Sequence, residues 1–240
     1  MLRCPSVLLS AVLAFAFNSS AYADISLSGT RLVFKGDKKE ASLTVRNMGS
    51  SEILVQSWLE GKDASTSIPF AITPPLARLD GNGRQILRVL FQGTGVPTDK
   101  ESVYWLNVQE IPKVAEGENV LQIAIRQRIK LFYRPSGLQG EVADAPAKLK
   151  WQIVGQEKGS QLQVQNTGVF YVSMVDLKVN GTKPINLMVA PGETVMVALE
   201  TTPKAGETLS FKSINDYGAK ESYSAILSQQ PVSTARVKSE

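Results

Sequence analysis

The sequence predicts an all-β protein built from two β-sandwich domains. From Asp24 onward nearly every apolar segment is a short alternating run closed by Gly, Pro, Asn or Asp, which is typical of strands. No segment shows the period of an amphipathic helix. A chain of 240 residues is long for one domain and suits two of about 100 residues. The pattern L-x-V-x-N-x-G at 43–49 recurs at 162–168, which favours two like domains over one large barrel.

Alternating runs divide the first half of the chain into about seven strands, a number that suits an immunoglobulin-like sandwich. These strands are expected over residues 25–34, 41–46, 53–59, 70–73, 87–91, 103–112 and 119–135. Pro74 and Pro75 cannot continue a central strand, so the chain is expected to end a strand or cross between sheets there. Trp58, Trp105 and Trp151 lie within strand-like runs and are expected in the core.

A second set of short strands follows a break in the pattern at residues 134–137, R-P-S-G. These strands are expected over residues 149–153, 162–164, 169–179, 185–189, 195–199, 209–214 and 223–227. Residues 140–146 form the expected linker. We therefore predict an N-terminal domain over residues 24–141 and a C-terminal domain over residues 142–240.

Residues 119–135, N-V-L-Q-I-A-I-R-Q-R-I-K-L-F-Y-R-P, form the longest strand-like run in the sequence. At roughly 3.3 Å per residue, a strand of about fifteen residues spans on the order of 50 Å, whereas an ordinary strand has about five or six residues. Two interpretations of this run stay open from its residues alone. It is either a long core strand whose cations face solvent, or an exposed edge strand that offers its aliphatic side chains and backbone to another chain.

The N-terminus has the pattern of a secretory signal peptide over residues 1–23. Arg3 supplies the positive charge, residues 7–17 the short apolar run, and A-Y-A at 21–23 the cleavage site. The apolar run is too short to span a bilayer, and no later stretch is long enough, so we expect an exported, soluble mature chain without membrane insertion. The one cysteine, Cys4, lies inside the signal, so the mature domains are expected to fold without disulfides.

The composition argues against most enzymatic and nucleic-acid functions. The chain has no histidine, which excludes Ser-His and Cys-His nucleophiles, a histidine general base and histidine-ligated zinc. The net charge is +4, from 26 basic and 22 acidic residues, and no basic run is interleaved with aromatic residues. We therefore expect neither catalysis, nor a metal or cofactor, nor a nucleic-acid partner.

Five motifs resemble, in their order along the chain, those of the periplasmic chaperones of the chaperone–usher pilus pathway. They are G-T-R-L-V-F at 29–34, I-T-P-P-L at 72–76, E-S-V-Y-W-L-N-V at 101–108, the run 122–135 and I-N-D-Y-G-A at 214–219. The resemblance implies two immunoglobulin-like domains set at an angle like a boomerang, with a cleft between them. It implies a pilin client whose own sandwich lacks its last strand, which the chaperone completes by donor-strand complementation, a known form of strand addition. Delivery to an outer-membrane usher would follow.

The same resemblance assigns roles to residues of the first domain. Arg31 and Lys130 match paired basic residues that anchor the client's C-terminal carboxylate, a group that favours charge-assisted donors. Leu121, Ile123 and Ile125 match the donor strand, whose aliphatic side chains would fill the client's apolar groove. Without the resemblance, the sequence favours the alternative that Arg31 and Lys130 are ordinary solvated cations on strands.

Three further charges, Glu101, Arg134 and Asp216, match a network that bridges the two domains; the alternative is three unrelated surface charges. The loop over residues 111–119 is short and lacks cysteine, which resembles the short-loop subclass of the family. The alternative function is that of an exported two-domain adhesin or carbohydrate-binding protein. An exposed donor strand would also favour self-association of the free protein, which the sequence does not decide.

Overall fold

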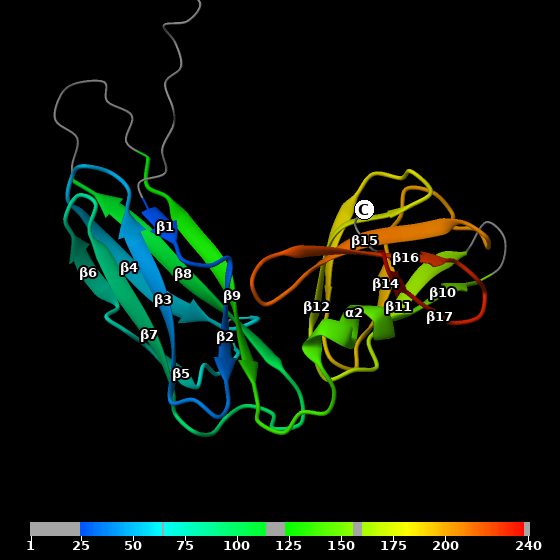
Figure 1. Cartoon of the computed structure of the whole chain (residues 1–240), viewed down its shortest axis with the longest axis horizontal. Coiled ribbons are helices and arrows are strands. Elements are labelled where there is room, and N and C mark those ends of the chain that lie inside the picture. Colours follow the sequence, from blue (N-terminus) through cyan, green and yellow to red (C-terminus); the bar gives the residue numbers. More distant parts are fainter. Residues whose placement is uncertain (1–24, 64, 114–122, 156–159, 238–240) are drawn as a thin grey trace, which may run out of the picture.

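The computed structural model describes residues 25–63, 65–113, 123–155 and 160–237, and its strands form two β-sandwiches that lie side by side (Figure 1). Each sandwich consists of a four-stranded and a five-stranded sheet around its own buried hydrophobic cluster. The prediction of an all-β fold with two sandwich domains is therefore confirmed. The predicted signal segment, residues 1–23, and Leu121 lie outside the described residues.

The first sandwich packs the sheet β1-β3-β7-β5 against the sheet β2-β9-β8-β4-β6. Its strands are β1 (Ile25–Leu27), β2 (Arg31–Lys35), β3 (Glu40–Asn47), β4 (Ile53–Glu60), β5 (Phe70–Thr73), β6 (Leu76–Leu79), β7 (Arg84–Phe91), β8 (Ser102–Pro112) and β9 (Arg126–Arg134). Alternate residues of facing strands fill the space between the sheets, and Val45, Val89, Leu106 and Leu131 are fully buried there. Burial of one face fixes the register of each strand, because a shift by one residue would expose its apolar side chains.

The second sandwich packs the sheet β14-β11-β10-β17 against the sheet β13-β12-β15-β16-β18. Its strands are β10 (Lys150–Val154), β11 (Gln161–Gln165), β12 (Val172–Val179), β13 (Ile185–Val189), β14 (Thr194–Val197), β15 (Thr208–Ile214), β16 (Lys220–Ile226), β17 (Val232–Ser233) and β18 (Ala235–Arg236). Trp151, Phe211 and Tyr223 form its aromatic centre; the rings of Phe211 and Tyr223 stack with centroids 5.4 Å apart.

The segment between the sandwiches contains helix, which the sequence pattern did not predict. The short 3-10 helix η1 (Val142–Asp144) runs into the single turn α2 (Ala145–Lys148), which begins with a proline at its first turn. The Pro146 carbonyl accepts a hydrogen bond of 2.7 Å from the Thr234 hydroxyl near the end of the chain. A single turn is too short to show a helical period, and proline is favoured at its start.

The strand expected over residues 119–135 is shorter in the structure. Strand β9 begins at Arg126, and its first pair with β8 is Gln109 with Arg126. Residues 123–125 precede it without belonging to a strand, although the Ile125 carbonyl accepts a hydrogen bond of 2.9 Å from the Glu110 amide. The alternation in sequence is real, but a strand is defined by its pairing, and the β8–β9 ladder stops at this point.

The expectation of a core position is wrong for two of the three tryptophans. Trp151 is fully buried, whereas Trp58 and Trp105 are half-buried on the outer face of the sheet. The Arg126 guanidinium lies 4.8 Å from the Trp58 ring centroid, and that of Arg128 lies 4.0 Å from the Trp105 ring centroid. The two arginines cover the faces of these tryptophan rings, so the rings are shielded although they lie outside the hydrophobic core. Each contact is a favourable cation–π interaction.

Candidate functional site

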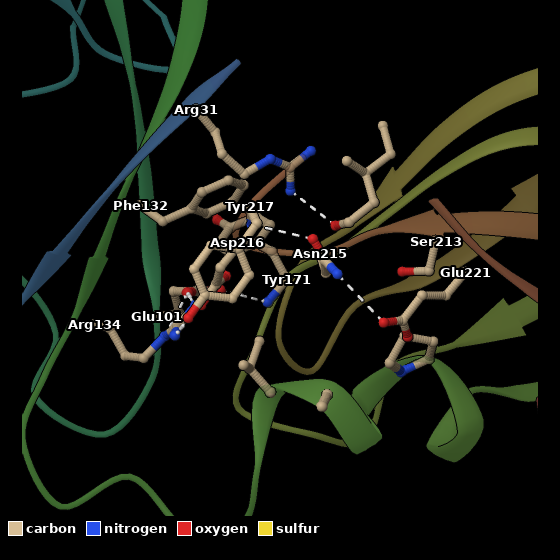
Figure 2. A pocket seen from close by; sticks show the side chains of 14 residues that line it. Arg31, Glu101, Phe132, Arg134, Tyr171, Ser213, Asn215, Asp216, Tyr217 and Glu221 are labelled. Atoms are coloured by element: carbon tan, nitrogen blue, oxygen red, sulfur yellow. Dashed lines mark hydrogen bonds and ion pairs between the residues drawn. The ribbon is translucent and has the colours of Figure 1, made fainter. Parts of the chain in front are cut away.

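The site lies where the outer face of the first sandwich meets the second sandwich. Strands β2 and β9 run parallel, and their ladder begins with Arg31 opposite Lys130. Alternate β9 side chains point out of the first sandwich toward the second, so Lys130, Phe132 and Arg134 share one face, and the Phe132 and Tyr171 ring centroids are 6.0 Å apart. Figure 2 shows Arg31, Phe132 and Arg134 opposite the residues that the second domain contributes.

Arg31 and Lys130 each form a hydrogen bond to the second domain. Arg31 donates from Nη1 to the Ile214 carbonyl at 2.9 Å, and Lys130 donates from Nζ to the Ser173 hydroxyl at 3.2 Å. Both acceptors are neutral, so neither bond neutralises the positive charge. Within the described part of the chain, neither cation has a carboxylate at ion-pair distance, and the buried Arg31 Nε has no hydrogen-bond partner.

The two cations are held next to each other in a partly buried place. Burial, followed by repulsion from Arg31, lowers the pKa of Lys130 to about 8. Burial also lowers the pKa of the Arg31 guanidinium, an effect that Asp216 and Glu101 oppose. Among the described residues, neither cation has a carboxylate at ion-pair distance. Such a pair has the chemistry to receive a carboxylate through charge-assisted hydrogen bonds.

Of the strands that the structure describes, only β8 pairs with β9 in the stretch just before this pair. The β2 ladder covers only Lys130–Arg134, whereas β8 pairs with β9 from Arg126 onward. Along the uncovered part, a groove of about 640 Å³ is lined by Gln127 and Ile129 together with residues 25–30 of β1 and the following turn. Of the residues matched to the donor strand, Ile123 is 68 % exposed and Ile125 is half-buried; Leu121 lies outside the described residues.

Arg134 links the two domains through two carboxylates. Its guanidinium pairs with Glu101 (Nη2–Oε1, 2.8 Å) of the first domain and with Asp216 (Nη1–Oδ2, 2.7 Å) of the second. The other Glu101 oxygen accepts a hydrogen bond of 2.8 Å from the Tyr171 amide. Glu101 is 3 % exposed. The structure thus brings together the three charges that the resemblance singled out, and it places them across the domain junction.

The pKa shifts of this network follow from its burial and pairing. Burial raises the pKa of Glu101, and attraction to Arg134 opposes that shift. Burial lowers the pKa of Arg134, but its hydrogen bond with Asp216 and the charges of Glu101 and Asp216 outweigh this and raise it. Arg134 is therefore held permanently charged between its two partners.

Sequence reasoning missed two residues of this site. Ser173 on β12 holds Lys130, and Tyr217 in the turn between β15 and β16 stands exposed at the cleft. No pattern distinguishes Ser173 from other strand serines. Tyr217 belongs to the motif at 214–219, from which we assigned a role to Asp216 alone.

In the described residues, no helix has the length and apolar character needed to cross a membrane. The same part of the chain contains no group of three or more carboxylate or cysteine side chains placed to hold a metal ion.

Comparisons with known proteins agree over nearly the whole chain. Residues 24–139 match the family "Pili and flagellar-assembly chaperone, PapD N-terminal domain", and residues 144–225 match "Pili assembly chaperone PapD, C-terminal domain". The probable fimbrial chaperone YadV of Escherichia coli K12 is 41 % identical over 224 residues, which are 86 % of this chain and 91 % of YadV.

Solved structures show the same similarity. The crystal structure of the YadV chaperone aligns with a TM-score of 0.72 and 36 % identity, covering 85 % of this chain and 100 % of that one. A structure of the Salmonella enterica SafA pilin in complex with the SafB chaperone aligns with a TM-score of 0.74 and 28 % identity, covering 87 % of this chain and 99 % of the matched chain.

Proposed function

The chain belongs to the pilus-assembly chaperones of the PapD type, and we propose that it binds pilus subunits in the periplasm, completes them with a strand and anchors their C-terminal carboxylate. The relative SafB is described in complex with the pilin SafA, which supports a pilin as the client. Delivery of the bound subunit to an outer-membrane usher completes the proposed cycle. The activity is one of binding, with neither a catalytic step nor a cofactor.

The observation that carries this proposal is the position of Arg31 and Lys130. They form the first pair of the β2–β9 ladder, so the open edge of β9 ends where the two cations stand. A client strand paired with that edge reaches the cations with its last residue. The C-terminal carboxylate of the client then pairs with the two cations, and each charge-assisted hydrogen bond contributes about 1.5–3 kcal/mol.

The same geometry supports a proposal for the direction of the client strand. A strand whose C-terminus lies at Arg31 and Lys130 occupies the place in the sheet just before β2 begins. It must therefore run in the same direction as β2, which is parallel to β9. We propose that the client pairs with β9 in parallel, using backbone groups of Arg126–Ile129 that β2 does not cover.

The donor residues supply the hydrophobic part of the interaction. Leu121, Ile123 and Ile125 precede β9, and Ile123 is 68 % exposed in the free protein. Burial of one such side chain in a client groove contributes about 1.5–3 kcal/mol before the entropic cost of ordering is subtracted. Because alternate residues point the same way, these three side chains can enter one groove, and the carboxylate anchor then sets their register.

We also propose the domain boundary at residues 141–142, and a structural role for Glu101, Arg134 and Asp216. These three charges join residues of both domains next to the cleft. Their role is to hold the angle at which the second domain presents Ser173 and the Ile214 carbonyl to the two cations.

Copurification from periplasmic extract tests the proposal. The unchanged protein should retain a small pilin subunit, identified by mass spectrometry, and Arg31→Ala and Lys130→Ala should retain little or none while staying folded. Lys183→Ala removes an exposed cation of the second domain, whose side chain is 82 % exposed, and serves as the matched control. Retention of the same subunit by both cleft variants would refute the anchoring role.

A further inference from the structure

Tyr217 is a large aromatic residue that the fold leaves almost entirely uncovered. Its exposed fraction is 95 %, whereas the other large hydrophobic residues exposed among those described lie between 36 % and 68 %. It stands at the tip of the turn between β15 and β16, which points from the second domain toward the first (Figure 1). Neither core packing nor the ion-pair network accounts for this ring.

The turn that carries Tyr217 is firmly held. The Asn215 side-chain oxygen accepts hydrogen bonds from the amides of Tyr217 (3.1 Å) and Ala219 (3.0 Å), and the Asn215 amide donates to the Ala219 carbonyl at 2.9 Å. Asp216 is fixed by Arg134. The turn therefore presents the ring from a fixed backbone, which lowers the entropic cost of using it in a contact.

Gly218 brings this turn against the first domain. Its φ of +84° lies in the left-handed region, and a Cβ built on it would stand 2.6 Å from the Thr30 hydroxyl oxygen. Only glycine combines this backbone conformation with so close an approach. Thr30 directly precedes Arg31, so the turn is seated beside the first residue of β2.

The ring stands where the two parts of the proposed client site meet. Tyr217 lines the interdomain cavity of about 230 Å³ together with Arg31 and Phe132, as Figure 2 shows. It also lines the groove at the open edge of β9, together with Gln127 and Ile129. A strand paired with that edge and ending at Arg31 and Lys130 therefore passes the ring with its last residues.

We propose that Tyr217 is a specificity-determining contact for the client, and that it packs against an apolar side chain within the last two residues of the pilin. This inference rests on the proposed function. Side chains of a strand alternate between its faces, so one of the last two must point toward the second domain, where Tyr217 stands. An aromatic ring favours an aliphatic or aromatic partner there, and its contact adds to the affinity that the carboxylate supplies.

The test uses the pilin subunit that copurifies with the unchanged protein. Its C-terminal peptide of about twelve residues, roughly 40 Å long when extended, is synthesised in its natural form and with its last two residues changed to glycine. Binding of both peptides is measured by fluorescence anisotropy to the unchanged protein, Tyr217→Ala, Tyr217→Phe and the control Met196→Ala, an exposed residue of β14.

We expect Tyr217→Ala to weaken binding of the natural peptide about threefold to tenfold, and to leave binding of the glycine-ended peptide unchanged. Tyr217→Phe should keep most of the affinity, and Met196→Ala all of it. Equal weakening of both peptides, no effect of Tyr217→Ala, or a pilin without an apolar side chain in its last two residues would each overturn the inference.

Lys130→Ala, measured with the same peptides, separates this inference from the proposed function. If Lys130→Ala abolishes binding and Tyr217→Ala has no effect, the anchoring function stands and the role of Tyr217 fails. If Lys130→Ala binds the natural peptide normally, or if no pilin copurifies, the proposed function fails and the role of Tyr217 fails with it.

Discussion

Arg31 and Lys130 are direct neighbours across the parallel ladder of β2 and β9, and each donates a hydrogen bond to the second domain. Two cations are thus held together by the neutral Ile214 carbonyl and Ser173 hydroxyl rather than by a carboxylate. Burial and then repulsion from Arg31 lower the pKa of Lys130, so the free protein bears the cost of keeping both cations charged there. In the proposed complex a client carboxylate would relieve this cost, so the pair would favour an occupied site.

Client binding should weaken as the pH rises above about 8. The free Lys130 ammonium has a pKa of about 8, and a bound carboxylate raises that pKa because it favours the charged form. Between these two values binding takes up a proton, so affinity falls with rising pH, by at most about tenfold per pH unit. Peptide titrations from about pH 7 to pH 10 measure this slope. Lys130→Arg stays charged and should be flat over the same range; a flat profile for the unchanged protein contradicts the prediction.

Ser173 should matter for binding although it lies in the second domain. Ser173→Ala removes the hydroxyl that holds the Lys130 ammonium, and we expect peptide affinity to fall about threefold to tenfold, the value of one hydrogen bond. Ser173→Thr keeps a hydroxyl and should restore most of it. Affinity is compared with the melting temperature of each variant. Two results would argue that Ser173 does not position Lys130. One is a loss of peptide affinity in proportion to the drop in melting temperature, and the other is an affinity of Ser173→Thr as low as that of Ser173→Ala.

Charge in the donor segment should block binding and spare the fold. Ile123 is 68 % exposed, so Ile123→Asp costs the free protein little. In the complex it would place a carboxylate in the client's apolar groove and remove a contribution of about 1.5–3 kcal/mol, at least tenfold in affinity. Ile86→Asp, at a position of β7 that is 46 % exposed, is the control. Circular dichroism reports folding and copurification reports binding. Unfolding of Ile123→Asp would show that its side chain belongs to the core.

Removal of the Arg134 guanidinium should be strongly destabilising. Arg134→Ala leaves the buried Glu101 carboxylate without its cation, and breaking a buried pair from one side costs about 3–5 kcal/mol. Arg88→Ala breaks the exposed pair with Glu40 and should cost less than about 1 kcal/mol. Urea denaturation gives both free energies of unfolding. Similar values for the two variants would mean that the interdomain network adds no more than a surface pair does.

The sequence predicts the fold better than it predicts the site. Burial of one face of each sheet requires apolar side chains at every second position, as at Leu43, Val45 and Val89. Strands and core residues can therefore be predicted from the sequence pattern. The site depends on which strands pair and on which residues of the second domain face them, and no local sequence pattern encodes either. Arg31 and Lys130 are 99 positions apart in sequence, and their importance came from a resemblance rather than from spacing.

The errors have physical reasons of the same kind. Trp58 was expected in the core because its run alternates, but the inward phase of β4 is that of Ile53 and Val55, and Arg126 covers the outward ring. Strand β9 begins later than the alternation predicts, because pairing and not alternation defines where a strand starts. The place of Tyr217 in the site cannot be predicted from the sequence, since it depends on the exposure of the side chain, which a sequence pattern does not report.

Hydrogen exchange along β9 is the most direct test of the proposal that this chain donates a strand to its client. The protein is measured by mass spectrometry alone and in complex with its copurified pilin, and peptides covering residues 123–129 are compared with those covering 131–134. The later residues pair with β2 and β8 already, so their exchange should not change, whereas the earlier residues pair on one edge at most. We predict strong protection of residues 123–129 in the complex. Unchanged exchange there, with the pilin bound, would contradict strand donation by this edge.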